Sequence, residues 1–300
     1  MTRPLAPVNS EMIESRRATS SLIRKPYLEI RKYLRTSPNN YPRFLYKYLS
    51  PDICDDWLTD YFLDSYFWLS SSIVFNDPYD TSGQIKYEGS VLQKRTRWNN
   101  IVKSQAPHLN KNERELEVTN LMVSKSNTLE NMQKIAQKNL EKIGLHCLNE
   151  DPRSLLMWSH YAKQHKGIVL QFEIAKDPET MLNAMKVNYS DEYPVLNLAQ
   201  DLEGQLPKII LRKFTDWDYE KEWRLLIING ASTYLRFQPK VLTGVIFGCR
   251  ADDGLRKRIQ KYVSKRVEQK LPFLNFYNAK MHQSQYKIIL ECDKSTISTI

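Results

Sequence analysis

The stretch that most constrains the fold runs from Gly144 to Glu173 and reads GLHCLNEDPRSLLMWSHYAKQHKGIVLQFE. Its apolar first residues predict a strand, and the apolar run from Ile168 to Ile174 predicts another. Between them, Asp151 followed by proline is typical of a helix start. We expect this helix to end two residues before Gly167, with the glycine in the left-handed conformation. A strand, a helix and a second strand must therefore pack closely together.

The predicted helix brings together aromatic residues and a histidine. Leu155, Trp158 and Ala162 fall at helical spacing, so we expect them to face the core. His160 lies on another face and Tyr161 follows it, which makes both candidates for a site beside the helix. Trp158 and Tyr161 are also candidates for stacking on a substrate ring.

Further strand patterns occur around residues 44, 66, 143, 168, 222, 241, 274 and 286, with helical patterns of uneven length between them. This order favours an α+β fold over a regular βαβ repeat. We predict a central mixed or antiparallel sheet covered by helices, and a doubly wound fold is the alternative. Residues 43–300 are expected to form a single domain, whereas residues 1–42 form a basic and partly disordered segment.

Residues 88–142 predict an all-helical insertion within this domain. Asn110 with Glu113, and Asn127 with Glu130, have the spacing of capping boxes, in which each end of a tetrapeptide bonds the backbone of the other. We expect the insertion to be a lid or subdomain with little chemistry of its own.

Polar residues stand at the edges of several predicted core elements. Glu222 and Arg224 alternate with apolar residues, so they share one face of a strand together with Glu220. Such residues form either an ion-pair ladder or a site that orients a carboxylate. The other candidates for substrate binding are Lys47 on an early strand and three residues of the loop at 76–80, namely Asn76, Asp77 and Asp80. The loop residues have the alternative of holding a turn.

The net charge of +10 comes from 44 basic and 34 acidic residues, and it is concentrated in two stretches. Residues 1–47 carry ten basic and three acidic residues, and residues 250–270 carry eight and three. Nucleic-acid binding is one explanation, and solvated helix faces are the other.

Several classes of protein are excluded by what the sequence lacks. No apolar run approaches the roughly 18 residues of a membrane helix, and no hydrophobic signal core is found near residue 1. The four cysteines are scattered, so we expect reduced thiols in the cytoplasm. No P-loop, GxGxxG, GxSxG or HExxH motif is present, and we expect no metal site. A nucleophilic pair of Cys147 with His160 competes with a buried, inert Cys147.

Five segments together resemble a known bacterial family: LYKYLS at 45–50, SSSIVFNDPYD at 70–80, LMWSHYAKQHKGIVLQF at 156–172, YEKEWRLL at 219–226 and VIFG at 245–248. The chain is similar in these segments to the domain-of-unknown-function family 2971 (DUF2971), and through it to AbiGi-type abortive phage-resistance proteins. The resemblance covers residues from about 44 onward. It implies a cytoplasmic prokaryotic protein with a role in defence against phage, and it implies no particular reaction.

Three functional hypotheses follow. The first is an enzyme that acts on a nucleotide such as NAD, with Glu222, His160 and Tyr161 as catalytic residues. The layout is similar to ADP-ribosyltransferase-like folds, in which a carboxylate on a late strand stabilises the cation formed when nicotinamide leaves. NAD would then be a substrate, and no cofactor is expected. The second is a protein that binds or cleaves nucleic acid through its basic stretches. The third is a phage sensor without catalysis.

Overall fold

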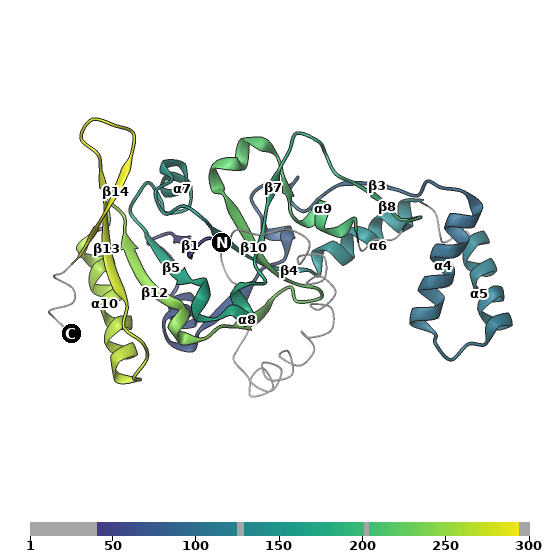
Figure 1. Ribbon diagram of the computed structural model, residues 1–300, viewed down its shortest axis with the longest axis horizontal. Coiled ribbons are helices and arrows are strands. Elements are labelled where there is room, and N and C mark those ends of the chain that lie inside the picture. The colour runs from purple at the N-terminus through teal and green to yellow at the C-terminus, as the bar shows by residue number, and fades with distance from the viewer. Residues whose placement is uncertain (1–40, 125–128, 201–203, 294–300) are drawn as a thin grey trace. The chain divides into compact units, whose positions relative to one another are not determined.

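The structure, a computed structural model, describes residues 41–124, 129–200 and 204–293 (Figure 1). The chain divides into two compact units. The first comprises the described residues of 1–74, 143–187 and 216–300, and the second comprises those of 75–142 and 188–215. The predicted N-terminal segment 1–42 lies outside the described residues apart from Tyr41 and Pro42.

An eight-stranded sheet forms the centre of the first unit (Figure 1). Its strands, in spatial order, are β14 (Ile288–Cys292), β13 (Asn275–Met281), β12 (Leu242–Phe247), β5 (Ile168–Glu173), β1 (Phe44–Leu49), β4 (Gly144–Asn149), β10 (Glu222–Ile227) and β6 (Met185–Lys186). Strands β12 and β13 are parallel, and all other neighbours in this sheet are antiparallel. The predicted α+β fold with a mixed sheet is therefore confirmed.

One predicted member of this sheet lies elsewhere. Strand β2 (Tyr66–Leu69) pairs with β11 (Thr233–Arg236) in a separate two-stranded sheet, and the short β6 takes the eighth place in the central sheet. The strand pattern near residue 66 is correct, but its place in the central sheet is wrong. Alternating burial indicates a strand with one covered face and does not identify the neighbouring strand.

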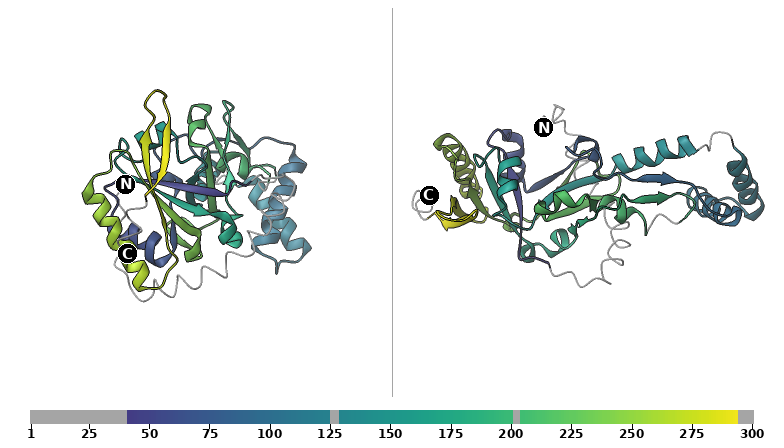
Figure 2. Two further views of the ribbon diagram at one scale, coloured as in Figure 1. Left: turned by 60° about the vertical axis from the view of Figure 1, so that its left-hand side comes forward. Right: turned by 90° about the horizontal axis from the view of Figure 1, so that it is seen from above.

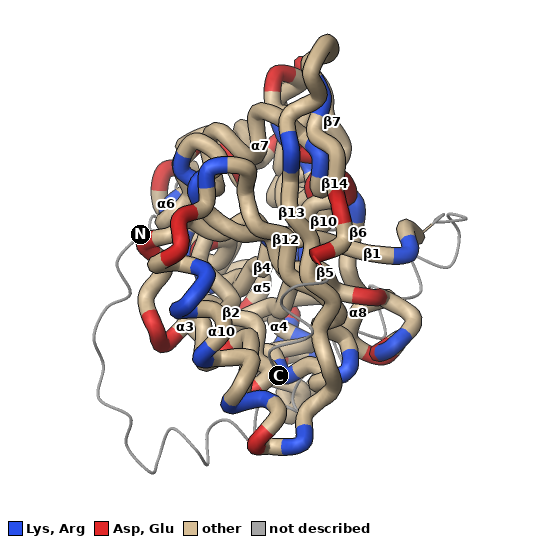
Figure 3. Tube along the Cα trace, turned by 90° about the vertical axis from the view of Figure 1, so that its left-hand side faces the viewer, with Lys and Arg blue, Asp and Glu red and all other residues tan. Residues whose placement is uncertain are grey.

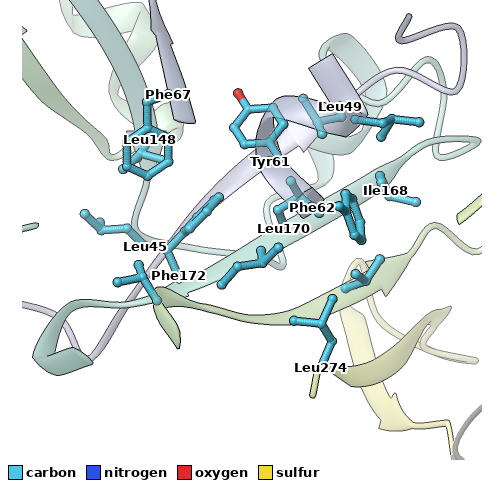
Figure 4. Packing of buried hydrophobic residues seen from close by; sticks show 14 of the residues in the cluster. Leu45, Leu49, Tyr61, Phe62, Phe67, Leu148, Ile168, Leu170, Phe172 and Leu274 are labelled. Atoms are coloured by element: carbon cyan, nitrogen blue, oxygen red, sulfur yellow. The ribbon is translucent and has the colours of Figure 1, made fainter. Parts of the chain in front are cut away.

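One face of the sheet packs into the larger hydrophobic core (Figure 4). Leu45, Leu148, Leu170 and Phe172 project from β1, β4 and β5 into this core. Helix α10 (Asp253–Glu268) lies beside the β12–β14 end of the sheet and adds apolar residues to the same core (Figure 2). The aromatic and aliphatic side chains exclude water from this face, which stabilises the unit by the hydrophobic effect.

The opposite face is covered by α7 (Leu155–His160). Met157 and Trp158 of this helix join Tyr46 and Tyr48 of β1 in a second hydrophobic cluster. This cluster fixes the helix against the middle of the sheet, so residues at the end of α7 lie on the same side as the outward side chains of β1.

Helix α7 is shorter than predicted. The carboxylate of Asp151 accepts a hydrogen bond from the Arg153 backbone N–H at 2.9 Å, which makes a turn before the helix. Ser154 is the actual N-cap and accepts from the Met157 backbone N–H. The chain leaves the helix after His160, and the left-handed conformation falls on the later residues Lys163, Gln164 and His165, where φ is 45°, 55° and 67°.

Gly167 is required for a different reason than its predicted left-handed conformation, because no glycine of the described chain has a positive φ. A Cβ atom on Gly167 would lie 2.0 Å from the backbone oxygen of Leu49, the last residue of β1. The glycine therefore permits a close approach of two backbones where β5 begins.

The remaining elements of the first unit are short. They are α3 (Asp55–Thr59), η1 (Asp60–Asp64), η2 (Ser72–Val74), η3 (Ile174–Lys176), α8 (Pro178–Met181), η4 (Thr215–Glu220, whose first residue belongs to the second unit) and η5 (Pro239–Val241). They connect the strands without extending the sheet.

The second unit contains the three predicted helices α4 (Val91–Gln105), α5 (Lys111–Val123) and α6 (Leu129–Glu141). The capping box of Asn110 and Glu113 is confirmed, and Asn127 of the other predicted box lies outside the described residues. The unit also contains β3 (Gln84–Lys86) paired with β8 (Val195–Asn197), β7 (Asn188–Tyr189) paired with β9 (Arg212–Lys213), and α9 (Leu206–Ile210). Across the described parts of both units, no helix is long and apolar enough to cross a membrane.

Candidate functional site

The polar residues predicted in the first unit gather around β1, β4 and β10. Directly opposite residues in antiparallel strands point to the same face. Asn149 of β4 is opposite both Tyr46 and Glu222, and Arg224 points the same way as Glu222. Since Tyr46 packs against α7, the helix that ends in His160 lies on the face of the sheet to which Glu222 belongs.

Glu222 and Arg224 form a bidentate ion pair within β10. The Arg224 Nε atom lies 2.8 Å from Oε1 of Glu222, and Nη2 lies 3.0 Å from Oε2. Both side chains are almost completely buried. Two parallel bonds to ionised groups are strong, and they compensate charges that would be costly to bury alone.

Lys47 lies where β1 and β4 separate. At one end of β4, Leu145 exchanges two backbone hydrogen bonds with Ser70, and at the other end Asn149 is opposite β1. Between these points, the backbone oxygen of Cys147 accepts a hydrogen bond from the Lys47 ammonium group at 2.8 Å. The lysine side chain therefore donates the hydrogen bond that this carbonyl oxygen would otherwise receive from the backbone of a neighbouring strand.

The same lysine is electrostatically coupled to the acidic residues. Burial lowers the pKa of Lys47, while Cys147, Glu222 and Glu220 act in the opposite direction. The lysine and the two carboxylates thus interact electrostatically and are referred to as one cluster of charges, although Lys47 alternates with Tyr46 and Tyr48 and leaves β1 on the other face of the sheet from Glu222.

Glu220 is a member of this cluster that was not among the predicted site residues. Its buried carboxylate accepts a hydrogen bond from the Tyr161 hydroxyl, and its backbone oxygen accepts from Nδ2 of Asn149 at 2.9 Å. The alternation of Glu220 with Glu222 was a signal for it. However, Glu220 ends η4 and does not belong to β10, because Lys221 between them has φ of 44°.

His160 occupies the exposed end of α7. Its ring faces Tyr219, with the ring centroids 6.2 Å apart. Tyr161 and Glu220, the next residue on each side, are bonded through hydroxyl and carboxylate. The structure thus brings the His160–Tyr161 dipeptide next to the Tyr219–Glu220 dipeptide.

Trp158 is completely buried, in contrast to His160. Its Nε1 atom donates to the Pro152 backbone oxygen at 2.9 Å, and its ring meets Tyr48 edge-on at 5.3 Å. The ring therefore acts as a core residue in this structure, and Tyr161 is the better placed of the two residues expected to contact a substrate.

The three loop residues predicted for substrate binding, Asn76, Asp77 and Asp80, belong to the second unit. The Asp77 carboxylate accepts from the Tyr79 backbone N–H at 2.9 Å and so holds the turn. Asp80 is buried 3.5 Å from the ammonium group of Lys213. Asn76 is exposed. Asp77 and Asp80 thus have structural roles within their own unit, and a role in binding stays a prediction for all three residues.

The Cys147 thiol and the His146 imidazole are poorly suited to nucleophilic chemistry. Burial, with Glu222 as the next cause, raises the pKa of the Cys147 thiol. Burial, with Lys47 as the next cause, lowers the pKa of His146, so its neutral ring donates from Nδ1 to the Trp68 backbone oxygen at 3.0 Å. No group of three or more histidine, cysteine, aspartate or glutamate side chains among the described residues is placed to hold a metal ion.

Comparison with known proteins gives one similarity. A family described as "Protein of unknown function (DUF2971)" matches residues 157–225. The matched segment contains most of α7, all of η4 and the first residues of β10, and it therefore includes Tyr161, Glu220, Glu222 and Arg224. No curated protein and no solved structure matches the chain.

Proposed function

We propose that the protein is an enzyme that breaks the N-glycosidic bond of a nucleotide such as NAD, releasing nicotinamide and transferring the remaining ribosyl group to water or to an acceptor. The observation that carries this proposal is the bond between Tyr161 and Glu220 beside Lys47, Glu222 and Arg224. The bond joins a hydroxyl to a carboxylate, and Lys47 interacts electrostatically with that carboxylate.

Glu220 is better suited than Glu222 to act on a substrate. Both oxygens of Glu222 are bonded to Arg224, whose positive charge compensates the carboxylate. Glu220 accepts a hydrogen bond from the Tyr161 hydroxyl, which orients it, and it interacts electrostatically with Lys47. We therefore assign the catalytic carboxylate to Glu220 and give Glu222 the role of holding Arg224 beside it.

The proposed reaction places positive charge on the ribose. When the bond between ribose and nicotinamide breaks, its electron pair leaves with nicotinamide and the ribose becomes an oxocarbenium-like cation. A fixed carboxylate stabilises this cation electrostatically. An attacking water then forms a new C–O bond and gives its proton to the carboxylate, so that the products are nicotinamide, ADP-ribose and a proton.

The other residues support this step in different ways. Lys47 supplies positive charge near the two carboxylates, whereas the charge of Arg224 is compensated by Glu222. A role of both residues in substrate binding stays a prediction. His160 lies beside Tyr219 at the outer edge of the cluster, where it can contact a substrate. The similarity to ADP-ribosyltransferase-like folds is part of this proposal, as are the relation to AbiGi-type proteins, a cytoplasmic location and a role in phage defence.

The experiment is incubation of the purified full chain with NAD, with released nicotinamide measured by liquid chromatography. Three variants are compared with the wild type: Glu220→Gln, Tyr161→Phe and, as a matched control, Glu179→Gln at an exposed position of α8. We expect the wild type and the control to release nicotinamide, and Glu220→Gln to be slower by about 10²–10³-fold. A folded Glu220→Gln protein with full activity, or a wild type that leaves NAD intact, contradicts the proposal.

The second candidate function is nucleic-acid binding or cleavage, favoured by the basic residues along α10 (Figure 3). Lys257, Lys261 and Lys265 are exposed and spaced by four residues, so they follow one side of the helix. Other basic residues of α10 have structural roles. Arg258 bonds Asp55, and the buried Arg266 bonds the backbone oxygens of Phe62 and Pro272.

Salt dependence separates the two functions. If α10 binds nucleic acid, affinity for a single-stranded or double-stranded oligonucleotide must fall steeply with salt, and the slope must decrease when Lys257 and Lys261 are changed to Gln. Absence of both binding and NAD cleavage would favour the third hypothesis, a phage sensor without catalysis.

A further inference from the structure

Three aromatic rings form a row next to the proposed catalytic carboxylate. The centroids of Trp217 and Tyr219 are 6.1 Å apart with an angle of 36° between the rings. The centroids of Tyr219 and His160 are 6.2 Å apart with an angle of 39°. The row therefore runs from η4 to the end of α7.

The rings of this row are accessible. His160 is exposed, whereas Trp217 and Tyr219 are half-buried. Half-buried aromatic rings retain surface that can stack on a planar ligand, and their attachment to a packed core reduces the entropy lost on binding.

The row is held in a fixed position relative to Glu220. Tyr219 packs against the hydrophobic cluster under α7, and its backbone oxygen accepts from the Ser154 hydroxyl at 3.4 Å. The neighbouring bond between Tyr161 and Glu220 joins the same two segments a second time. A ligand stacked on the row would therefore lie next to the carboxylate.

We propose that Trp217, Tyr219 and His160 form a nucleobase-binding subsite, which takes the flat heteroaromatic ring of a ribonucleotide. This inference rests on the proposed function and extends it by assigning the part of the substrate that is recognised. Stacking suits any planar base, so the row binds purine and nicotinamide rings alike.

The experiment measures binding and does not require turnover. Adenosine monophosphate, nicotinamide mononucleotide and ribose 5-phosphate are titrated into the full chain by calorimetry. The first two differ in their heteroaromatic base, and the third has no base. We expect both nucleotides to bind at least about fivefold more tightly than ribose 5-phosphate, since stacking on one base is worth about 1–3 kcal/mol, or roughly 5- to 150-fold in affinity.

Variants locate the binding to the row. Trp217→Leu is expected to weaken binding of both nucleotides about tenfold, and His160→Ala is expected to weaken it less. Phe273→Leu, at an aromatic residue that is 79% exposed and outside the row, is the matched control and should bind as the wild type does. Circular dichroism checks that each variant folds. Should Trp217→Leu not fold, Trp217→Phe, which retains a ring, and the comparison of the three ligands on the wild type provide the test.

Several outcomes overturn the subsite. These are equal affinity for ribose 5-phosphate and the nucleotides, unchanged nucleotide binding by a folded Trp217→Leu protein, or preferential binding of an uncharged oligosaccharide. Nucleotide binding through the row without NAD cleavage would leave the subsite standing and contradict the proposed reaction. NAD cleavage that is unaffected by Trp217→Leu would contradict the subsite and leave the proposed reaction standing.

Discussion

The guanidinium group of Arg224 holds both carboxylate oxygens of Glu222, two residues earlier on the same strand. Side chains two residues apart in a strand point to the same face, which allows this contact. The geometry is that of a buried structural pair, because each charge satisfies the other at a site almost closed to solvent. We therefore expect Glu222 to contribute measurably to stability.

Glu222→Gln should lower the free energy of unfolding by about 3–5 kcal/mol, because it leaves the buried guanidinium without its compensating charge. The measurement is urea unfolding followed by circular dichroism. The double variant Glu222→Gln/Arg224→Met removes both charges and should recover part of the lost stability. A folded Glu222→Gln protein of wild-type stability that releases no nicotinamide would instead make Glu222 the catalytic carboxylate.

The fold could be predicted in large part because the central strands carry their own signal. Apolar runs such as those of β5 and β12 are typical of strands buried on both faces. Neighbour relationships were harder to predict, and β2 was assigned to the wrong sheet. The residues that pair with it, Thr233–Arg236, lie far along the chain, and no local pattern indicates that distant pairing.

The candidate site was predictable only in part, for a related reason. Glu222 and Arg224 were expected on one face from their alternation, and they form a pair. Glu220 and Tyr161 are 59 residues apart, and the turn at Lys221 that directs Glu220 toward α7 has no clear sequence signal. Trp158 was expected both to face the core and to stack on a substrate ring. Its spacing along the helix predicts burial, but this spacing alone does not exclude contact with a ligand.

Lys47→Met should change how stability depends on pH. Burial is the main cause of the lowered pKa of Lys47, so the folded protein releases this proton below the ordinary pKa of 10.5. Between the lowered folded pKa and 10.5, the unfolded chain binds more protons, and stability must rise with pH. We therefore expect the wild type to gain stability relative to Lys47→Met as pH increases toward 10.5.

Urea unfolding at a series of alkaline pH values measures this difference. Lys257→Met, at an exposed position of α10, is the matched change for loss of one lysine charge. Equal pH slopes for Lys47→Met and the wild type would mean that Lys47 retains its proton over the whole range.

His146→Phe should remove part of the acid sensitivity of the fold. The buried His146 ring has a pKa well below 6.5 and stays neutral in the folded protein, whereas the unfolded chain takes up the proton below 6.5. Stability is therefore fully present above 6.5 and is lost as pH falls, with a slope of up to about 1.4 kcal/mol per pH unit.

Phenylalanine retains the ring that stacks on Phe67 at 4.5 Å and removes the titrating group. Unfolding measured from pH 7 down to about 5 should show a shallower slope for His146→Phe. Leu148→Ala, a non-titrating change at a buried residue of the same strand, should keep the wild-type slope while lowering stability at every pH. Identical slopes for all three proteins would place the acid sensitivity elsewhere.

Gly167→Ala tests the close approach between β1 and the start of β5. The new methyl group would lie 2.0 Å from the Leu49 backbone oxygen and 3.2 Å from the Ala162 Cα atom. Both are backbone atoms, so no side chain can rotate to relieve the clash, and the strand or the turn before it must move. We expect stability to fall by more than about 2 kcal/mol, as for other changes that overpack a core. Gly204→Ala, where a Cβ meets no atom within 4 Å, is the matched control and should change the melting temperature little. A Gly167→Ala protein with the melting temperature of the wild type would show that the backbones of Leu49 and Gly167 can separate at little cost.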